Sequence, residues 1–302
     1  AFTYRPAASV SSVWPSRGAA EGGTPVTVMG SGFSSSAAAL GALRCRFNTT
    51  SVRALYVSES ALVCNTTASR PGYAMVEVST NGREYTSSSV RFELVTVMVR
   101  SLTPWSGPQL GGTVVTIAGA RVAHVEAIRC AFGSFALSAP SLAVSSGSEA
   151  SPTSVVTVAS AHGSDGVRCA SPGALATGWS SVELSSYGAT LRSGGSFYVH
   201  PAVHLSEVVP PAGPVAGGTQ VSLLGGSGLR VSATLRCRFE SSGATAPARV
   251  VGAGQIECAA PPSSSSGSRR VEVSLNGQQF SASGVAFTYR PAASVSSVWP
   301  SR

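Results

Sequence analysis

Side chains capable of catalysis are scarce in this sequence. Its 302 residues contain one aspartate, Asp165, and four histidines. His162, Ser164 and Asp165 are the residue types of a hydrolytic triad, but they crowd into one glycine-rich segment, where such close spacing does not favour the required relay. A Ser-Asp-Gly turn is the better interpretation. We therefore predict that the chain is not an enzyme.

Metal and phosphate sites are not expected either. Calcium needs clustered carboxylates, which one aspartate and dispersed glutamates do not supply. A structural zinc site needs Cys-X-X-Cys or His-X-X-His pairs, and Pro201 disfavours a helical pairing of His200 with His204. The segment 225–228 lacks the lysine and the helix of a phosphate-binding loop. No cofactor is predicted, apart from covalently attached glycans.

Glycosylation is the chemistry that the sequence supports. Asn48-Thr49-Thr50 and Asn65-Thr66-Thr67 are acceptor sequences for N-glycosylation of Asn48 and Asn65. Two runs rich in serine and proline, 145–154 and 261–266, are candidates for O-glycans or modified prolines, with plain flexible loops as the alternative. The candidate residues in these runs are Pro152, Thr153, Pro261, Pro262, Ser263 and Ser264.

An internal repeat organises the chain. Gly-Gly-Thr occurs at 22–24, 111–113 and 217–219, and each copy follows a proline and precedes an alternating apolar segment. Arg-Cys-X-Phe comes next, at 44–47, 129–132 and 236–239. Each copy then has a second cysteine, a variant of Val-Glu-Val-Ser, a turn and an aromatic strand; the turns are Asn81-Gly82, Tyr187-Gly188 and Asn276-Gly277. Three copies of one order of elements predict three copies of one fold.

Alternation within these strands predicts which side chains face the core. In the first copy Leu43, Cys45 and Phe47 point inward, and Leu235, Cys237 and Phe239 do so in the third. Two inward cysteines per copy predict one disulfide each: Cys45 with Cys64, Cys130 with Cys169, and Cys237 with Cys258. Disulfides imply an oxidising, extracellular compartment. Six buried free thiols in a cytosolic protein are the alternative.

The recurring order of proline, Gly-Gly-Thr, Cys-X-Phe and Asn-Gly resembles the IPT/TIG family, the immunoglobulin-like domains of plexins and transcription factors. The resemblance covers essentially the whole chain and implies tandem β-sandwiches of about seven strands that bind or act as scaffolds. The second copy departs most, with Ala118-Gly119-Ala120 at the turn after the first strand and Tyr187-Gly188 in place of Asn-Gly.

We predict an all-β chain of three such domains in an extended rod. Residues 1–8 are expected to be the final strand of a preceding repeat, 9–95 the first domain, 96–200 the second, 201–290 the third and 291–302 the start of the next repeat. The second domain has a long insertion, 134–166, whose apolar stretch 155–158 is interpreted as an added hairpin or docking arm, or else as part of a disordered, glycosylated loop.

A longer period is superimposed on these domains. Residues 1–17 recur without a change at 286–302, an offset of 285 residues (286 minus 1). This recurrence indicates a long array of nearly identical three-domain units, or one period taken from such an array with overlapping ends. A duplicated segment produced by cloning is the alternative.

Charge and hydropathy exclude several partners. All 21 basic residues are arginine, and they are dispersed, so the net charge of +8 does not predict nucleic-acid binding. No window approaches the roughly 18 apolar residues of a membrane span, so no membrane contact is expected within this segment. The chain opens without a start methionine or signal peptide, and we expect an internal piece of a longer mature protein.

The sequence thus predicts an extracellular or cell-surface structural glycoprotein. Its tandem array is expected to form or decorate a filament or surface coat, with other copies of itself and glycans as partners. The main alternative is the ectodomain of an adhesion or signalling receptor of plexin or fibrocystin type. A carbohydrate-binding accessory to an enzyme is a third class.

Overall fold

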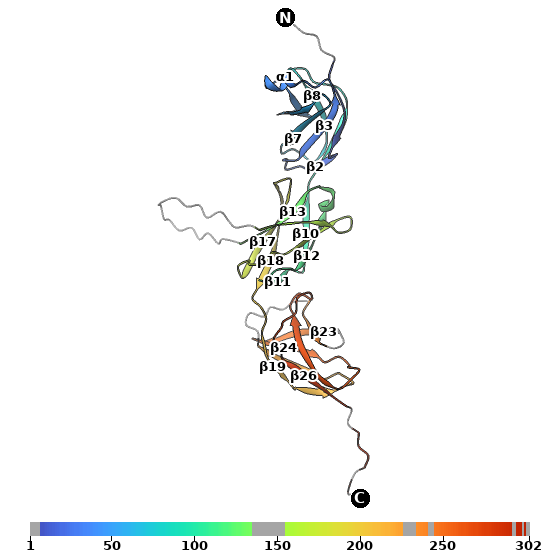
Figure 1. Cartoon of the computed structure of the whole chain (residues 1–302), viewed down its shortest axis with the longest axis vertical. Helices are drawn as coiled ribbons and strands as arrows, with labels where there is room; N and C mark the ends of the chain where they lie inside the picture. The colour runs from blue at the N-terminus through green and yellow to red at the C-terminus, as the bar shows by residue number, and fades with distance from the viewer. Residues whose placement is uncertain are drawn as a thin grey trace, which may run out of the picture. The chain divides into compact units, whose positions relative to one another are not determined.

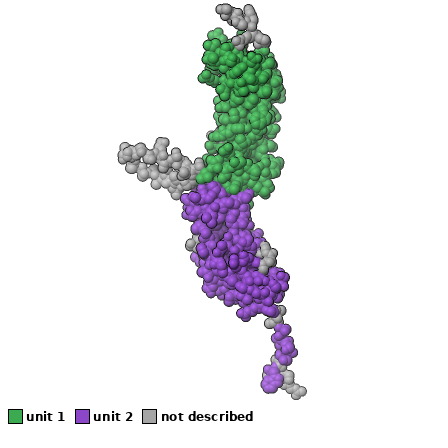
Figure 2. Space-filling view, in the orientation of Figure 1, with its two compact units in different colours: residues 1–103, 115–170, 181–196 green, residues 104–114, 171–180, 197–302 purple. Residues whose placement is uncertain are grey.

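The computed structural model describes residues 7–134, 155–225, 234–240, 245–291, 294–297 and 299. Within this part of the chain the structure is almost entirely β-strand, with one short α-helix and one 3₁₀-helix (Figure 1). Residues 1–103, 115–170 and 181–196 form one compact unit, and residues 104–114, 171–180 and 197–302 form a second (Figure 2). The all-β fold class expected from the sequence is confirmed.

The first repeat is a sandwich of two sheets that lies within the first unit. One sheet has the order β1 (Ser9–Trp14), β3 (Pro25–Ser31), β7 (Ala61–Asn65) and β6 (Leu55–Ser58). The other has the order β2 (Arg17–Ala19), β9 (Val90–Val95), β8 (Gly72–Ser79), β4 (Arg44–Phe47) and β5 (Thr50–Arg53). Only β2 and β9 pair in parallel. The helix α1 (Ser35–Ala39) begins after Ser34, whose side chain accepts a hydrogen bond from the N–H of Ala37.

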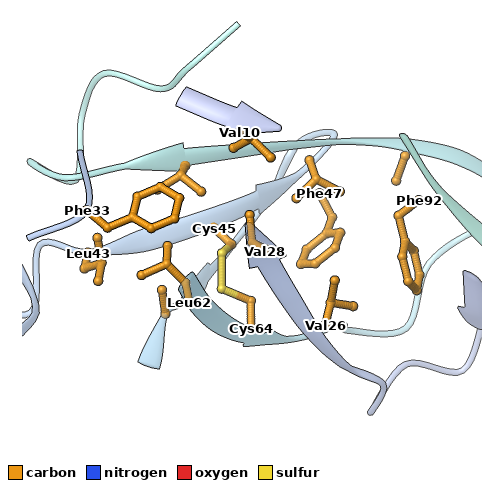
Figure 3. Packing of buried hydrophobic residues seen from close by; sticks show 14 of the residues in the cluster. Val10, Val26, Val28, Phe33, Leu43, Cys45, Phe47, Leu62, Cys64 and Phe92 are labelled. Atoms are coloured by element: carbon orange, nitrogen blue, oxygen red, sulfur yellow. A yellow bond between two sulfur atoms is a disulfide. The ribbon is translucent and has the colours of Figure 1, made fainter. Parts of the chain in front are cut away.

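The core of this sandwich follows the predicted alternation. Leu43, Cys45 and Phe47 on β4 are buried, as are Leu62 and Cys64 on β7. Because β4 and β7 belong to different sheets, the Cys45–Cys64 disulfide crosses the core, between Leu62 on one side and Val26 on the other (Figure 3). The cluster is completed by Val10, Val28, Phe33, Ala74, Val76 and Phe92, among other apolar residues.

The second repeat has a four-stranded and a five-stranded sheet. The order of the first is β10 (Met98–Thr103), β12 (Val114–Ala120), β16 (Gly166–Ala170) and β15 (Ser160–Ala161). The order of the second is β11 (Ser106–Pro108), β18 (Ala189–His200), β17 (Gly178–Ser186), β13 (Ile128–Ser134) and β14 (Val155–Val158). The 3₁₀-helix η1 (Val122–His124) follows β12.

The strand β14 corrects one sequence prediction. Residues 155–158 were expected to form an added hairpin or arm, or a disordered loop, but they pair antiparallel with β13, so that Cys130 lies opposite Thr157. In the first repeat Cys45 lies opposite Val52 of β5 in the same way. Val155–Val158 is therefore the counterpart of β5. The additional residues of this repeat lie between β13 and β14, where residues 135–154 are outside the described part of the chain.

In the third repeat all strands belong to one continuous hydrogen-bonded ladder. Its order is β19 (Leu205–Val209), β21 (Gln220–Gly225), β24 (Gln255–Ala259), β23 (Thr245–Gly252), β22 (Arg236–Phe239), β25 (Gly267–Ser274), β26 (Ala286–Arg290) and β20 (Ala212–Pro214). The long strand β23 pairs with β22 through its first half and with β24 through its second half, so it connects what are two sheets in the first repeat. Leu235, Cys237 and Phe239 are buried, as predicted.

One packing motif recurs in all three repeats. Gly18, Gly107 and Gly213 lie on β2, β11 and β20, and a Cβ atom on any of them would lie less than 3.0 Å from the hydroxyl of Thr24, Thr113 or Thr219, the threonine of the Gly-Gly-Thr loop. The same Cβ would approach the ring of Phe92, Phe197 or Phe287 to 2.9, 2.8 or 2.8 Å. The motif explains why the glycine, the threonine and the phenylalanine recur together.

We expect Gly213→Ala to destabilise the third repeat, because the added methyl group has no room beside Thr219 and Phe287. Overpacking of this kind lowers the free energy of unfolding by about 1–3 kcal/mol, which urea denaturation would measure. Gly252→Ala in the same repeat is the matched control, since the nearest atom to its new Cβ lies 3.9 Å away. Equal stability of the two variants would contradict the proposed packing constraint.

Candidate interdomain interface

The turn after β8 and the turn after β25 have the same internal hydrogen bonds. In the third repeat the Oδ1 atom of Asn276 accepts from the N–H groups of Gln278 and Gln279, at 2.9 and 3.1 Å. In the first repeat Asn81 Oδ1 accepts from the N–H groups of Arg83 and Glu84, at 3.0 and 2.9 Å. This Asx turn leaves the Nδ2 group of each asparagine available to donate.

In the third repeat that group reaches the second repeat, within the second compact unit. Asn276 Nδ2 donates to Thr113 Oγ1 at 3.1 Å and to the carbonyl oxygen of Ser106 at 3.3 Å. It also donates to Gln279 Oε1 at 2.7 Å. Asn276 is only 4% exposed and Thr113 is fully buried, so these contacts are largely shielded from water.

Two glutamines extend the contact along the Gly-Gly-Thr loop. Gln279 accepts from Thr113 Oγ1 at 2.9 Å and donates to the carbonyl oxygen of Gly112 at 3.0 Å. Gln278 accepts from the N–H of Val114 at 2.8 Å and donates to the carbonyl oxygen of Val114 at 2.9 Å. We call these side chains, Asn276, Gln278 and Gln279, the amide clasp.

The loop that receives the amide clasp depends on its glycines. Gly111 and Gly112 have φ values of +76° and +77°, and a side chain at Gly111 would collide with the backbone of Pro172 and Gly173. The clasp exploits the main chain that these glycines expose, because four of its hydrogen bonds are to backbone N–H or C=O groups. Each neutral hydrogen bond contributes roughly 1 kcal/mol net, less where water competes.

A cavity of about 320 Å³ adjoins the amide clasp, with Leu110 and His200 on one wall and Leu275 and Phe280 on the other. His200 is 6% exposed; its Nδ1 lies 2.8 Å from the carbonyl oxygen of Pro201, and its Nε2 is buried without a hydrogen-bond partner among the described residues. Burial lowers the pKa of His200 below its ordinary value of 6.5, opposed by the bond to Pro201. The ring is therefore neutral at pH 7.

The equivalent end of the first repeat has no such clasp. Tyr187 occupies the position of Asn276, and its hydroxyl donates to Glu126 Oε2 at 3.2 Å. Thr24 Oγ1, the counterpart of the clasped hydroxyl, is buried without a partner among the described residues. Glu93 instead lies 3.3 Å from Arg121 and 3.6 Å from Arg17. Exposed ion pairs of this kind contribute little, about 0–1 kcal/mol.

The six predicted cysteines form the three expected pairs. Cys45–Cys64, Cys130–Cys169 and Cys237–Cys258 have Cα–Cα distances of 6.3, 6.3 and 6.5 Å, and all six residues are buried. No cysteine of the chain is left free. In the chain-entropy account, a bond that closes a loop of 19 to 39 residues stabilises its repeat by about 3–4 kcal/mol.

The two predicted N-glycosylation sites are exposed at strand ends. Asn65 is the last residue of β7, and Asn48 lies in the turn between β4 and β5 with φ +52°. Asn48 is held more firmly, because its Oδ1 accepts from the N–H of Met75 at 2.8 Å. Their attachment to glycans stays a prediction.

The proline-rich candidates divide between described and undescribed residues. Pro152 and Thr153 lie outside the described part of the chain. Pro262 and Ser264 are exposed, while Pro261 and Ser263 are half-buried. The carbonyl oxygen of Pro261 accepts from the hydroxyl of Tyr289 at 2.7 Å, and the N–H of Ser263 donates to Val215. Of these four, Pro262 and Ser264 are the more accessible to modification.

The residues considered for catalysis are not assembled into a relay. His162 lies 3.2 Å from the guanidinium group of Arg168, and Ser164 donates to the adjacent Asp165 at 3.5 Å. Among the described residues no group of three or more His, Cys, Asp or Glu side chains is placed to hold a metal ion. In the same part of the chain, no helix has the length and apolar character needed to cross a membrane.

The amide clasp was missed by the sequence interpretation, which assigned Asn276-Gly277 and Gly111-Gly112-Thr113 only to turns of the fold. The available indication was the polar pair that follows Asn-Gly, Gln278-Gln279. Its meaning depends on a neighbouring repeat, and the strand pattern of one repeat does not contain that information.

We expect the stability of the second unit to fall as the pH is lowered from about 7 toward 5. His200 has a lower pKa folded than unfolded, so below 6.5 the unfolded chain binds more protons and gains stability relative to the folded one. Urea denaturation across this range would measure the slope. In His200→Gln the part of the slope that is due to this residue should disappear, whereas an unchanged slope would contradict the assignment to His200.

Comparison with known proteins identifies the domain type. The model of the family described as IPT/TIG domain matches residues 8–94 and 204–289 and leaves out the second repeat, whose motifs depart most. No curated protein sequence matches the chain significantly.

Solved structures have the same fold over nearly the whole chain. A structure of the full extracellular region of plexin A4 aligns with 94% of this chain at 19% identity and a TM-score of 0.53; this chain spans 24% of that plexin chain. Another structure of the plexin A4 extracellular region aligns with 95% of this chain and 34% of its own length, at 15% identity and a TM-score of 0.41. The family match covers more than half of the chain, which therefore belongs to the IPT/TIG domain family.

Proposed function

We propose that this chain is part of a structural extracellular glycoprotein, in which tandem IPT/TIG repeats form or decorate a filament or surface coat by self-association. The observation that carries the proposal is the unaltered recurrence of residues 1–17 at 286–302, although the repeats inside the unit have diverged. A repeated unit kept so nearly constant suits a protein whose neighbours are copies of itself.

An extracellular location is supported by two independent features. Three disulfides, one in each repeat, are typical of proteins that fold in an oxidising compartment. The plexin A4 region with the same fold is itself an extracellular region. Adhesion or structural support is the role that such a location and a non-catalytic domain family favour.

The amide clasp supports a structural role in a more specific way. Hydrogen bonds through Asn276, Gln278 and Gln279 hold the third repeat against the second at a fixed register of residues. Ordered junctions of this kind stiffen a tandem array. A stiff array has a regular axial repeat, which lateral or end-to-end assembly requires.

Electron microscopy of the native material would test the proposal. We expect filaments, or a coat, with an axial repeat equal to one three-domain unit. Dispersed single particles in sedimentation at native concentration would contradict self-association. They would favour the alternative, a plexin-like or fibrocystin-like receptor ectodomain, for which a transmembrane segment elsewhere in the full-length protein would be the supporting observation.

We also expect Asn48 and Asn65 to carry N-linked glycans, because both side chains are exposed and both sequences are acceptors. Intact-mass analysis before and after enzymatic deglycosylation would measure the attached mass. Asn65→Gln and Asn48→Gln should each remove one glycan without unfolding the first repeat. A mass unchanged by deglycosylation would contradict the prediction at both positions.

A further inference from the structure

The first repeat has a hairpin end that corresponds to the clasp side of the second–third junction. Asn81, Arg83 and Glu84 stand where the third repeat has Asn276, Gln278 and Gln279. The Asx turn is the same, and Asn81 Nδ2 donates to Glu84 Oε2 at 2.9 Å, as Asn276 donates to Gln279. The difference is burial, since Asn276 is 4% exposed and Asn81 lies on the surface.

A cavity beside Asn81 matches one wall of the cavity beside the amide clasp. It also measures about 320 Å³, and Val78, Glu84 and Tyr85 line it where Val273, Gln279 and Phe280 line the other. The opposite wall of the clasp cavity comes from the second repeat, with Leu110 and His200 among its residues. The first repeat therefore presents one half of a junction.

The third repeat presents the complementary half. Its loop Gly217-Gly218-Thr219 has φ values of +77° and +81° at the glycines, as the clasped loop of the second repeat has. Thr113 and Ser106, which the amide clasp covers, are buried, whereas their counterparts Thr219 and Ala212 are half-buried. The acceptor surface is thus built but only partly covered.

Charge distinguishes this pair of ends from the second–third junction. Arg290 occupies the position of the neutral His200, and Glu84 occupies the position of Gln279. His200 and Gln279 line one cavity, so their replacements bring a guanidinium group and a carboxylate to the same place. Arg83 can still donate to a main-chain carbonyl but cannot accept from an N–H as Gln278 does. Opposite charges therefore replace part of the neutral hydrogen bonding.

The sequence also gives the order in which the two ends meet. Residues 294–299 repeat Ser9–Trp14, which form β1, so the strand that leaves a third repeat leads into a first repeat. The partner of the Asn81 hairpin is accordingly a second copy of the three-repeat unit, the one that precedes it in the array.

We propose that the Asn81 hairpin of each first repeat binds the Gly218-Thr219 loop of the third repeat before it. Asn81 Nδ2 and Glu84 contact Thr219 Oγ1, and Glu84 pairs with Arg290. This inference rests on the tandem array of the proposed function but not on its assembly into filaments. It assigns a specific contact to the one junction that a single unit does not contain.

A chain of two units, in which residues 18–302 of a second copy follow Arg302 of the first, would test the contact. Spin labels on unnatural amino acids at Ser264 of the first copy and Ser69 of the second report on the new junction by pulsed electron paramagnetic resonance. Labels at Thr177 and Ser264 of one copy report on the second–third junction. All three positions are exposed. We expect narrow distance distributions at both junctions.

Matched substitutions separate the contact from local folding. Asn81→Asp in the second copy keeps the oxygen that holds the turn and removes the donor, so only the new junction should broaden; Asn276→Asp should broaden only the second–third junction. Glu84→Gln should keep the new distribution narrow but abolish its broadening at high salt, because exposed ion pairs are screened.

A broad distribution at the new junction that Asn81→Asp leaves unchanged, beside a narrow second–third junction, would overturn the proposal. That outcome would leave the proposed structural function standing, with a hinge in every unit. Failure of self-association in sedimentation would instead contradict the proposed function and leave this contact intact.

Discussion

The Gly-Gly-Thr loop is the element on which both the domain and the junction depend. Its threonine hydroxyl fills the space left by Gly107 and contacts the region of Phe197 inside the second repeat. The same hydroxyl of Thr113 exchanges hydrogen bonds with Asn276 and Gln279 of the third repeat. A change that displaces this threonine therefore disturbs the core and the neighbouring domain together, which constrains the loop more than an ordinary surface turn.

The three repeats share this loop but use it differently. Where the following hairpin has Asn and two glutamines, the buried hydroxyl is fully bonded; where it has Tyr187, the hydroxyl of Thr24 is buried without a partner among the described residues. An unsatisfied buried hydroxyl costs about 1–3 kcal/mol. The first–second junction has the exposed ion pairs of Glu93 in its place. Divergence in the hairpin has thus changed junction chemistry while the Gly–Thr–Phe packing inside each repeat is preserved.

Much of the fold was predictable from the sequence because burial in a sandwich is a local, alternating property. The inward positions of Leu43, Cys45 and Phe47 follow from strand periodicity, and paired inward cysteines indicate the bond across the core. Junction contacts were not predictable in this way, because Gln278 and Gln279 are ordinary exposed residues until a second domain approaches. The role of residues 155–158 was also misjudged, since a long insertion before them obscured the strand that every repeat has at this position.

The register of β13 with β14 has a consequence for how the array can vary. The chain leaves the sheet after Phe132 and returns at Val155 opposite it, whereas in the first repeat Phe47 is followed by only two residues before Thr50 lies opposite it. The ladder is thus the same for a tight turn and for a very long excursion. Each doubling of a flexible loop costs only about 0.6 kcal/mol, so this position tolerates large changes in length. Evolution can use it as a port for display, where new sequence is added to every unit without altering the scaffold that carries it.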